Sequence, residues 1–309
     1  MELNRVLVIT GASGFLGTWL ADEAYQAGYT LIGLDLRAPF RPQIWSGFAT
    51  SSLETVDLTQ LLGNREVHAV FHLAGGASVG ASVSDPYGDF YSLLPGTARL
   101  ALYLIKFHRQ ARLFLFSSAA VYGNPQQLPI TEASLVAPIS PYGVHKATAE
   151  TLLLHYQKIY NLNLVIFRIF SIYGPGLRKQ LIWDVSQRAA AAVSAHESSI
   201  TLFGTGQESR DFLYVKDLCR AALLTLAFSG QVPGNILNLA SGVETTVADV
   251  ATKLVHHLGY DIEIKFNGIV PKGDPTNWRA DISLLRETGF SPNYTIDNGL
   301  EEFASWAIS

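Results

Sequence analysis

The fold is decided by the stretch Arg5-Val6-Leu7-Val8-Ile9-Thr10-Gly11-Ala12-Ser13-Gly14-Phe15-Leu16-Gly17. Its first half is a short run of β-branched and aliphatic residues, which predicts a strand buried on both faces of a parallel sheet. Glycines follow, and an amphipathic helix then runs to Ala27. Strand, glycine turn and helix in this order suit a dinucleotide pyrophosphate, because the helix N-terminus presents backbone N–H groups to it. A tight turn also needs glycine without any ligand, so that alternative stays open.

The three glycines have separate expected uses. Gly11 permits the tight turn, Gly14 lets backbone amides approach the phosphates, and Gly17 lets the helix pack close to the strand. The next strand, 29–34, ends at Asp35, about 20 residues beyond the turn, where a carboxylate can accept hydrogen bonds from an adenosine ribose. Such a carboxylate repels a 2′-phosphate and favours NAD over NADP, although Arg37 could receive that phosphate. Asp35 could otherwise simply end the strand.

The ends of two further predicted strands carry more candidate cofactor-binding residues. The prolines, serines and glycines of residues 38–52 predict a surface loop, and 53–56 predicts a strand that delivers Asp57 to the adenine amino group. A buried strand at 67–73 is followed by small residues, which leave room for a ligand or serve only a turn.

A helical region is expected from about Pro86 to His108, and the strand 112–116 then ends at Ser117 and Ser118. Ligands of parallel sheets bind beyond the carboxyl ends of the strands, so Ser118 is a catalytic candidate. A strand-end serine that bonds its own backbone is the alternative.

Tyr142 and Lys146 belong to the stretch Ser140-Pro141-Tyr142-Gly143-Val144-His145-Lys146, which opens an apolar-periodic run to Tyr160. A spacing of four places both side chains on one face of a helix. A nearby ammonium favours the phenolate and lowers the pKa of a tyrosine from about 10 toward working pH. The spacing therefore predicts an acid/base device, although a helix start can also carry a Tyr and a Lys four apart by chance.

The alternation of strands and helices stops after a strand at 162–170. The later segments predict helices at 181–195, 247–258, 282–288 and 296–307, a short strand at 201–203, and one returning sheet strand at 235–239. The predicted fold class is α/β, a Rossmann-type doubly wound parallel sheet with a smaller C-terminal α/β substrate-binding lobe. Residues 1–170 with 211–241 are assigned to the NAD-binding domain, and 171–210 with 242–309 to the lobe.

The composition indicates a compact protein with a small-molecule partner. Hydrophobic residues make up 48% of the 309, and the net charge of −4 leaves no basic footprint for nucleic acid. The single cysteine, Cys219, excludes an internal disulfide framework and a cysteine cluster for metal, which suits a reducing cytoplasm. We recognise no targeting signal and no run near the ~20 apolar residues of a membrane span. We therefore expect a cytoplasmic protein with no membrane partner and no metal.

Taken in order, the motifs resemble those of the extended short-chain dehydrogenase/reductase family, in its nucleotide-sugar epimerase/dehydratase branch, over nearly the whole chain. The matching stretches are Thr10–Gly17, Asp35, Asp57-Leu58, His72–Gly75, Ser117–Gly123, Tyr142 with Lys146, Arg168–Gly176, Arg210–Asp217 and Gly273-Asp274.

The resemblance implies a role for each matching residue. Tyr142 would be the acid/base, Ser118 would share its hydrogen bond with the sugar hydroxyl, and Lys146 would hold the nicotinamide ribose and lower the tyrosine pKa. Arg210 would bind the diphosphate, unless it pairs with an acid such as Asp211. The implied cofactor-binding residues are Gly11, Ser13, Gly14, Phe15, Leu16, Gly17, Asp35, Asp57, Leu58, Leu73, Ala74, Gly75, Tyr142 and Lys146. The implied substrate-binding residues are Ser118, Ser171, Phe203, Arg210 and Asp274.

Departures from the family pattern narrow the expected chemistry. Ala119 and Ala120 stand where dehydratases of the branch usually have an aspartate and a glutamate, which argues against 4,6-dehydration. His145 replaces the common serine before the lysine, and either adds pH sensitivity or is an exposed helix residue. Leu93 and Ser171 stand where many relatives have an asparagine. Pro271, with Lys272 beside it, stands where a second phosphate-binding arginine is common.

We expect an NAD-dependent nucleotide-sugar 4-epimerase that works through a transient 4-keto sugar. The same three site residues also serve an NAD(P)H-dependent reductase of a nucleotide-linked 4-keto-6-deoxysugar or a nucleotide-glucuronate decarboxylase. A different class of protein, one that senses NAD without turnover, is the further alternative. Such a protein would be expected to lack part of the catalytic triad, whereas Ser118, Tyr142 and Lys146 are all present. Relatives commonly pair through the helix before Ser118 and the helix that carries Tyr142, so a homodimer is expected.

Overall fold

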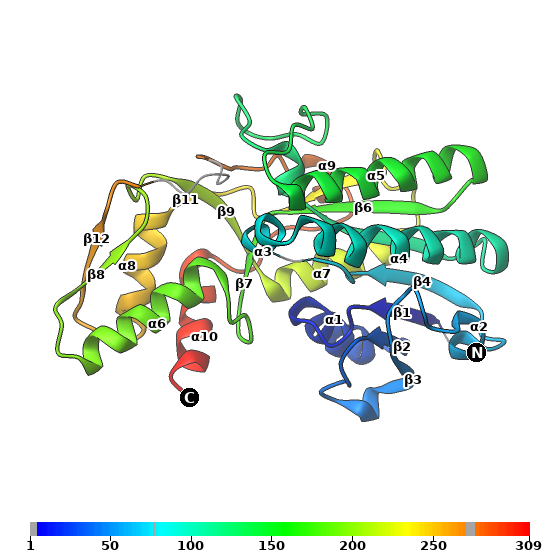
Figure 1. The fold of residues 1–309 in the computed structure, drawn as a ribbon, viewed down its shortest axis with the longest axis horizontal. Coiled ribbons are helices and arrows are strands. Elements are labelled where there is room, and N and C mark those ends of the chain that lie inside the picture. The colour runs from blue at the N-terminus through cyan, green and yellow to red at the C-terminus, as the bar shows by residue number, and fades with distance from the viewer. Residues whose placement is uncertain (1–4, 77, 270–275) are drawn as a thin grey trace. The chain divides into compact units, whose positions relative to one another are not determined.

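A seven-stranded sheet forms the centre of the fold in a computed structural model, which describes residues 5–76, 78–269 and 276–309. Its strand order is β10-β6-β5-β4-β1-β2-β3. Figure 1 labels β6, β4, β1, β2 and β3 of this sheet. The strands are β1 Val6–Thr10, β2 Thr30–Asp35, β3 Trp45–Thr50, β4 Val67–His72, β5 Arg112–Ser118, β6 Leu164–Ile169 and β10 Ile236–Leu239. The chain runs outward in parallel pairs from β1 to β3, returns to the middle, and runs outward again through β4, β5 and β6. This confirms the predicted Rossmann-type doubly wound sheet.

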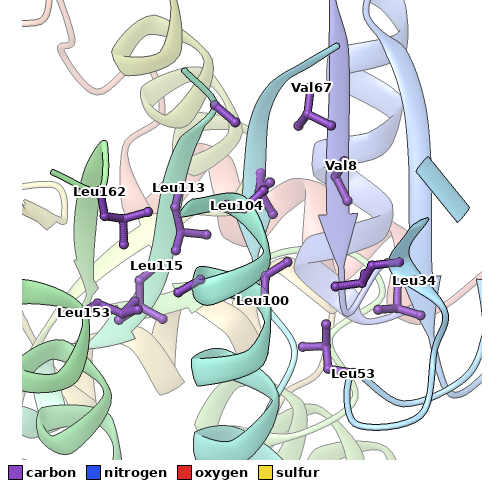
Figure 2. Packing of buried hydrophobic residues seen from close by; sticks show 14 of the residues in the cluster. Val8, Leu34, Leu53, Val67, Leu100, Leu104, Leu113, Leu115, Leu153 and Leu162 are labelled. Atoms are coloured by element: carbon purple, nitrogen blue, oxygen red, sulfur yellow. The ribbon is translucent and has the colours of Figure 1, made fainter. Parts of the chain in front are cut away.

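Helices alternate with these strands along the chain. They are α1 Phe15–Gln26, α2 Leu58–Leu62, α3 Val79–Ser84, α4 Pro86–Phe107, α5 Pro141–Tyr160 and α7 Val215–Ala227, with 3-10 turns η1 Pro42–Ile44 and η2 Ala119–Tyr122. One apolar cluster joins Leu100 and Leu104 of α4 and Leu153 of α5 to strand residues such as Val8 and Leu113 (Figure 2). All five residues of β1 are buried, which explains why its sequence is apolar without alternation.

The C-terminal part of the chain contains two smaller sheets. β9 Ser209–Tyr214 pairs antiparallel with β11 Glu244–Thr246 and parallel with β7 Ser171–Tyr173. β12 Glu263–Phe266 pairs in parallel with β8 Ser199–Leu202. The helices here are α6 Gln180–Ser194, α8 Val247–His257, α9 Ser283–Arg286 and α10 Ile296–Ala307, and α8 packs on both α6 and α10.

The chain divides into two compact units. One comprises Met1–Gly123, Val136–Ile169 and Ala222–Leu237, and the other comprises Asn124–Leu135, Phe170–Ala221 and Asn238–Ser309. Compared with the division expected from the sequence, residues 124–135, 170, 211–221 and 238–241 lie in the second unit. Two contacts account for part of this difference: Ile130 bridges to Ala280, and β9 belongs to the three-stranded sheet.

The strand predicted at 53–56 is wrong, because those residues form a turn, and β3 lies within the expected loop instead. β3 pairs in parallel with β2, and the rings of Trp45 and Phe48 cover Gly33 of that strand. An edge strand pairs on one side only, so a stretch with serine and glycine can form it. Leu53 and Val56 are apolar because the turn buries them in the cluster under α4.

Candidate active site

The turn between β1 and α1 has the backbone that its glycines predict. Gly11 has a φ of 70°, and a Cβ on Gly17 would lie 2.2 Å from the Gly11 carbonyl oxygen, so only glycine lets α1 begin this close to the turn. Gly14 is the N-cap of α1, and none of the described side chains caps that helix end. The first backbone N–H groups of α1, from Phe15 and Leu16 onward, are therefore left for an anionic ligand, which fits a dinucleotide pyrophosphate.

Asp35, at the end of β2, is tied to the same turn. Its Oδ2 accepts a 3.0 Å hydrogen bond from the backbone N–H of Ser13, and its Oδ1 accepts one of 2.9 Å from that of Arg37. The guanidinium of Arg37 donates to the Ser13 carbonyl at 3.0 Å and has its Nε 3.8 Å from Asp35 Oδ1. The carboxylate expected to bind a ribose and the arginine that could receive a 2′-phosphate therefore contact one another.

Asp57 and Leu58 have structural uses that the sequence did not indicate. Asp57 is the N-cap of α2, and its carboxylate accepts the Gln60 N–H at 3.0 Å. Leu58 is buried in the apolar cluster. Contact of these two residues with a cofactor stays a prediction.

Leu73, Ala74 and Gly75 follow β4 beside the glycine turn. The backbone N–H groups of Leu73 and Ala74 donate to the carbonyl and the hydroxyl of Thr10, at 3.1 and 3.3 Å. Gly75 has a φ of 130°, and a Cβ there would lie 2.7 Å from a methyl of Leu93. The backbone conformation and the packing against Leu93 therefore require glycine at position 75, whether or not a ligand also lies there.

Ser117 and Ser118 are adjacent in β5 and make different contacts, as expected for successive strand residues. Ser117 is 2% exposed, and its hydroxyl donates to the carboxylate of Glu150. The Ser118 hydroxyl accepts the Ala120 N–H at 3.2 Å and is hydrogen-bonded with the phenol of Tyr142. Ser118 therefore bonds local backbone, as one interpretation expects, and also contacts the candidate acid/base, while its catalytic role stays a prediction.

Tyr142 lies in the first turn of α5, which begins after the N-cap Ser140. Its backbone N–H donates a 3.0 Å hydrogen bond to the buried hydroxyl of Ser82, so α3 holds this turn in place. Burial raises the pKa of the Tyr142 phenol, the hydrogen bond with Ser118 lowers it, and the charge of Asp89 raises it. The expected net lowering is therefore not found, because loss of water from the phenol outweighs the favourable contact.

Lys146 is 4% exposed, and its ammonium donates a 3.1 Å hydrogen bond to the carbonyl of Phe116. The Nζ lies 5.7 Å from the centre of the Tyr142 ring. Burial lowers the pKa of Lys146 to about 8, and the charges of Asp89 and Glu150 oppose that shift. The lysine is thus cationic at neutral pH but titrates not far above it.

A buried ion pair next to this lysine escaped the sequence analysis. Arg168 Nη2 lies 2.8 Å from Glu150 Oε2, and each side chain is 4% exposed. Arg168 also donates to the Tyr122 hydroxyl at 3.0 Å. The spacing of four between Lys146 and Glu150 was an available signal, because it places both on one helix face.

A second ionisable pair lies beside the Tyr142–Lys146 turn. His145 Nδ1 is 2.6 Å from Asp89 Oδ2, and the two side chains are 13% and 8% exposed. His145 is therefore not the exposed helix residue of one expectation. Nothing in the sequence marks Asp89 as its partner, since 56 residues separate them.

Three of the predicted substrate residues lie in the second unit. Ser171 begins β7, Phe203 is 55% exposed, and Arg210 lies in β9. The Arg210 guanidinium donates to the carbonyls of Ser209 and Thr276 at 2.8 and 3.2 Å and lies 5.7 Å from the ring of Trp278.

Asp211, the alternative partner of Arg210, accepts hydrogen bonds from Ser241, Gly242 and Ala280. Burial raises its pKa to about 6 despite these bonds. Asp274 lies outside the described residues, as do its neighbours at 270–275.

The described ranges contain no group of three or more His, Cys, Asp or Glu side chains that could hold a metal ion. None of the helices in these ranges is long and apolar enough to cross a membrane.

The sheet topology, the glycine turn, and the contacts among Ser118, Tyr142 and Lys146 define a dinucleotide-dependent enzyme of the short-chain dehydrogenase/reductase type. Within that class, the chain belongs to the NAD dependent epimerase/dehydratase family, whose model matches residues 7–240.

Relatives match nearly the whole chain. A UDP-glucose 4-epimerase of Mycolicibacterium smegmatis is 29% identical, over 95% of each chain. The crystal structure of a UDP-glucose 4-epimerase from Thermotoga maritima with UDP-glucose has a TM-score of 0.86 and 26% identity, and covers 98% of each chain. That of a UDP-glucuronic acid 4-epimerase from Bacillus cereus, with UDP-glucuronic acid and NAD, has a TM-score of 0.86 and 25% identity, over 98% of this chain and 99% of the other.

Proposed function

We propose that this protein is an NAD-dependent 4-epimerase of a UDP-linked sugar. The observation that carries the proposal is the Tyr142 phenol, hydrogen-bonded with Ser118 and next to the buried ammonium of Lys146, in a chain similar over nearly its full length to named 4-epimerases. The similar proteins named above are epimerases, which favours this reaction over the reductase and decarboxylase alternatives.

The proposed mechanism moves one proton at one oxygen. Tyr142 takes the proton of the sugar C4 hydroxyl, and the Ser118 hydroxyl holds that oxygen by sharing its hydrogen bond. The phenol must first ionise, which burial opposes, and its hydrogen bond with Ser118 offsets part of that cost. The Lys146 ammonium, 5.7 Å from the ring centre, would add a positive charge that favours the phenolate. NAD, when bound, supplies reversible hydride acceptance at C4. Once the transient 4-keto sugar has turned, return of the hydride to C4 from the opposite face, together with return of the proton from Tyr142 to the C4 oxygen, would give the C4 epimer.

We assign the remaining candidates to binding roles. NAD would be held by the glycine turn, by Asp35 and by Lys146, with the residues at 57–58 and 73–75 beside it. The substrate would be held by Ser171, Phe203, Arg210 and Asp274, with Arg210 on the diphosphate because its planar guanidinium can grip two oxygens. The first unit would thus hold the cofactor and contribute Ser118 to the sugar, and the second would supply the other substrate-binding residues.

We further propose a homodimer built on the outer faces of α4 and α5. Both helices leave large apolar side chains in solvent, among them Tyr87 at 75%, Tyr91 at 51%, Val144 at 45% and Ile159 at 62% exposed. Exposed apolar side chains that recur along adjacent helices support association. Light scattering should give twice the chain mass, and Tyr87→Glu with Ile159→Glu should reduce it to a monomer. A cytoplasmic location is proposed from the single cysteine.

The test of the reaction has two stages. Denaturation of the purified protein should release NAD, which chromatography identifies. The native protein, with no added cofactor, should then interconvert the C4 epimers of one UDP-sugar in a panel of glucose, glucuronate and N-acetylglucosamine forms. An enzyme that releases no NAD, and turns over a 4-keto sugar only with reduced cofactor, would establish the reductase alternative instead.

A further inference from the structure

We propose that Ser82 is a positioning residue for Tyr142: its hydroxyl, in α3, accepts the backbone N–H of the tyrosine and so holds the candidate acid/base in place beside Ser118. Ser82 acts on the reaction through the position of the tyrosine backbone and not through the reacting atoms. The inference rests on the proposed 4-epimerase activity, which gives Tyr142 its role.

The start of α5 explains why Tyr142 needs this partner. The first N–H groups of a helix come before its ladder of backbone hydrogen bonds and take their partners from elsewhere. Pro141, the first residue of α5, has no N–H. The N-cap Ser140 serves the third and fourth residues, because its hydroxyl accepts the Gly143 N–H at 3.2 Å and its carbonyl accepts the Val144 N–H at 3.0 Å. The second residue, Tyr142, takes its partner from outside the helix.

Ser82 supplies that partner from 60 residues away, at 3.0 Å. Its side chain is 0% exposed, and its hydroxyl hydrogen is donated to the Val79 carbonyl at 2.7 Å. Since a serine hydroxyl has one hydrogen, the Ser82 oxygen can face the Tyr142 N–H only as an acceptor. The bond therefore has one direction, and the burial of Ser82 shields it from water.

The helix that carries Ser82 is itself anchored. Asp85 ends α3 with its backbone N–H on the Ala81 carbonyl at 2.9 Å, and its carboxylate accepts the Gly88 N–H at the start of α4, also at 2.9 Å. The two helices thus meet at one residue, and α4 continues into the apolar cluster through Leu100. A six-residue helix has little stability alone, whereas one joined to a 22-residue helix of the core keeps its place.

The same turn of α5 also contacts the segment that follows Ser118. A Cβ on Gly143 would lie 2.6 Å from the Ala120 carbonyl oxygen, so the turn packs tightly against η2. The Ala120 N–H in turn donates to the Ser118 hydroxyl at 3.2 Å. Contact with η2 therefore limits how closely the turn approaches the serine, and the bond to Ser82 restrains the backbone at Tyr142 itself.

A shift of this backbone is passed on to the phenol. A tyrosine side chain has two rotatable bonds and a rigid ring, and its staggered rotamers leave few ways to compensate for a displaced Cα. The phenol oxygen that bonds with Ser118 and would meet the C4 hydroxyl of the sugar therefore follows the Tyr142 backbone. Misplacement of a reacting group by about 1 Å can cost about 100-fold in rate.

The test is the kinetics of two Ser82 variants and one control. Ser82→Ala removes the acceptor, so kcat should fall by about 10- to 100-fold. KM for the UDP-sugar should stay within about twofold, because the loss falls on the transition state and the residues assigned to bind the rest of the substrate are unchanged. Ser82→Thr keeps the hydroxyl, which can still bond the carbonyl three residues earlier, and should retain at least about a third of the wild-type kcat.

Ser186→Ala is the matched control. Ser186 is also a buried helix serine, 2% exposed, and its hydroxyl also donates to the carbonyl three residues earlier, that of Trp183, at 2.8 Å. Its alanine variant should leave kcat unchanged. If Ser82→Ala loses no more activity than Ser186→Ala, the inference is overturned. An equal loss in Ser82→Ala and Ser82→Thr would also overturn it, since the size of the side chain and not its hydroxyl would then be responsible.

Hydrogen exchange provides a readout that does not depend on turnover. In protein labelled with isotope in its tyrosine amides, the Tyr142 signal is the one that disappears in Tyr142→Phe. This amide should exchange slowly in the wild type and in Ser186→Ala, and at least about tenfold faster in Ser82→Ala. An unchanged exchange rate in Ser82→Ala would overturn the inference even in a fully active epimerase.

Failure of the proposed function gives a different result. A wild type that converts none of the UDP-sugars would overturn the 4-epimerase proposal and this inference with it. An active wild type with an equally active Ser82→Ala would overturn this inference alone.

Discussion

The buried ammonium of Lys146 donates to the backbone carbonyl of Phe116, 3.1 Å away, on the strand that ends at Ser118. One hydrogen bond thus ties the helix that carries Tyr142 to the strand that carries the serine. This bond fixes the distance between α5 and β5. It also keeps the Lys146 charge near the phenol, at the cost of removing that charge from water. The acid/base geometry is therefore part of the packing of α5 on the sheet.

Replacement of the acid/base should abolish turnover without disturbing binding. Tyr142→Phe removes one oxygen and leaves the ring in place, so kcat should fall by at least about two orders of magnitude, the range of general acid/base catalysis. NAD content after purification and the thermal midpoint should match the wild type. A variant that retains most of its activity would show that another group moves the proton.

The Arg168–Glu150 ion pair should matter more to stability than an exposed pair. Glu150→Gln leaves the buried Arg168 charge without its partner and should lower the free energy of unfolding by about 3–5 kcal/mol. The control is Lys253→Met, which breaks the exposed Lys253–Asp249 pair, 3.4 Å apart, and should cost under about 0.5 kcal/mol. Urea denaturation of the two variants measures the difference, and equal costs would mean that the buried charge is solvated.

A side chain at Gly17 should disturb the glycine turn, whereas one at Gly80, the control, should not. Gly17→Ala places a Cβ 2.2 Å from the Gly11 carbonyl oxygen, so α1 must move; we expect a loss of about 1–3 kcal/mol and a loss of bound NAD. Gly80→Ala, in α3, meets its nearest atom at 3.9 Å and should be neutral or stabilising by about 0.5–1 kcal/mol. NAD retained by Gly17→Ala at the wild-type level would argue against pyrophosphate binding here.

His72 predicts a pH dependence of stability. The hydroxyls of Thr10 and Thr97 hold its two ring nitrogens at 2.7 and 2.8 Å, and burial lowers its pKa from 6.5 to about 3. Between these values the unfolded chain carries a proton that the folded chain does not, so stability falls as the pH falls through this range. The slope is at most about 1.4 kcal/mol per pH unit for one group.

The variant His72→Gln isolates that contribution. Glutamine can bond both hydroxyls but does not titrate, so the unfolding free energy of the variant should fall less steeply than that of the wild type between pH 6.5 and 4.5. Parallel curves for the two proteins would contradict the low pKa of the buried imidazole.

The local chemistry of the chain determined most of the fold and of the candidate triad. The apolar run of β1, the glycines after it, and the spacing of Tyr142 and Lys146 act over a few residues, so their consequences follow from strand and helix geometry alone. The same reasoning failed at β3, because an edge strand is stabilised by the neighbour it pairs with, β2, more than by its own composition.

Only the tertiary structure decided the electrostatics of the site. Asp89 lies 56 residues from His145, and Arg168 lies 18 from Glu150, so no local pattern could pair them. The upward shift of the Tyr142 pKa likewise depends on burial, a property of the packed unit, and that burial outweighs the favourable contacts of the phenol. Residue types and spacing named the candidate proton-transfer groups, whereas their burial and their long-range partners, which shift their pKa values, follow only from the packed structure.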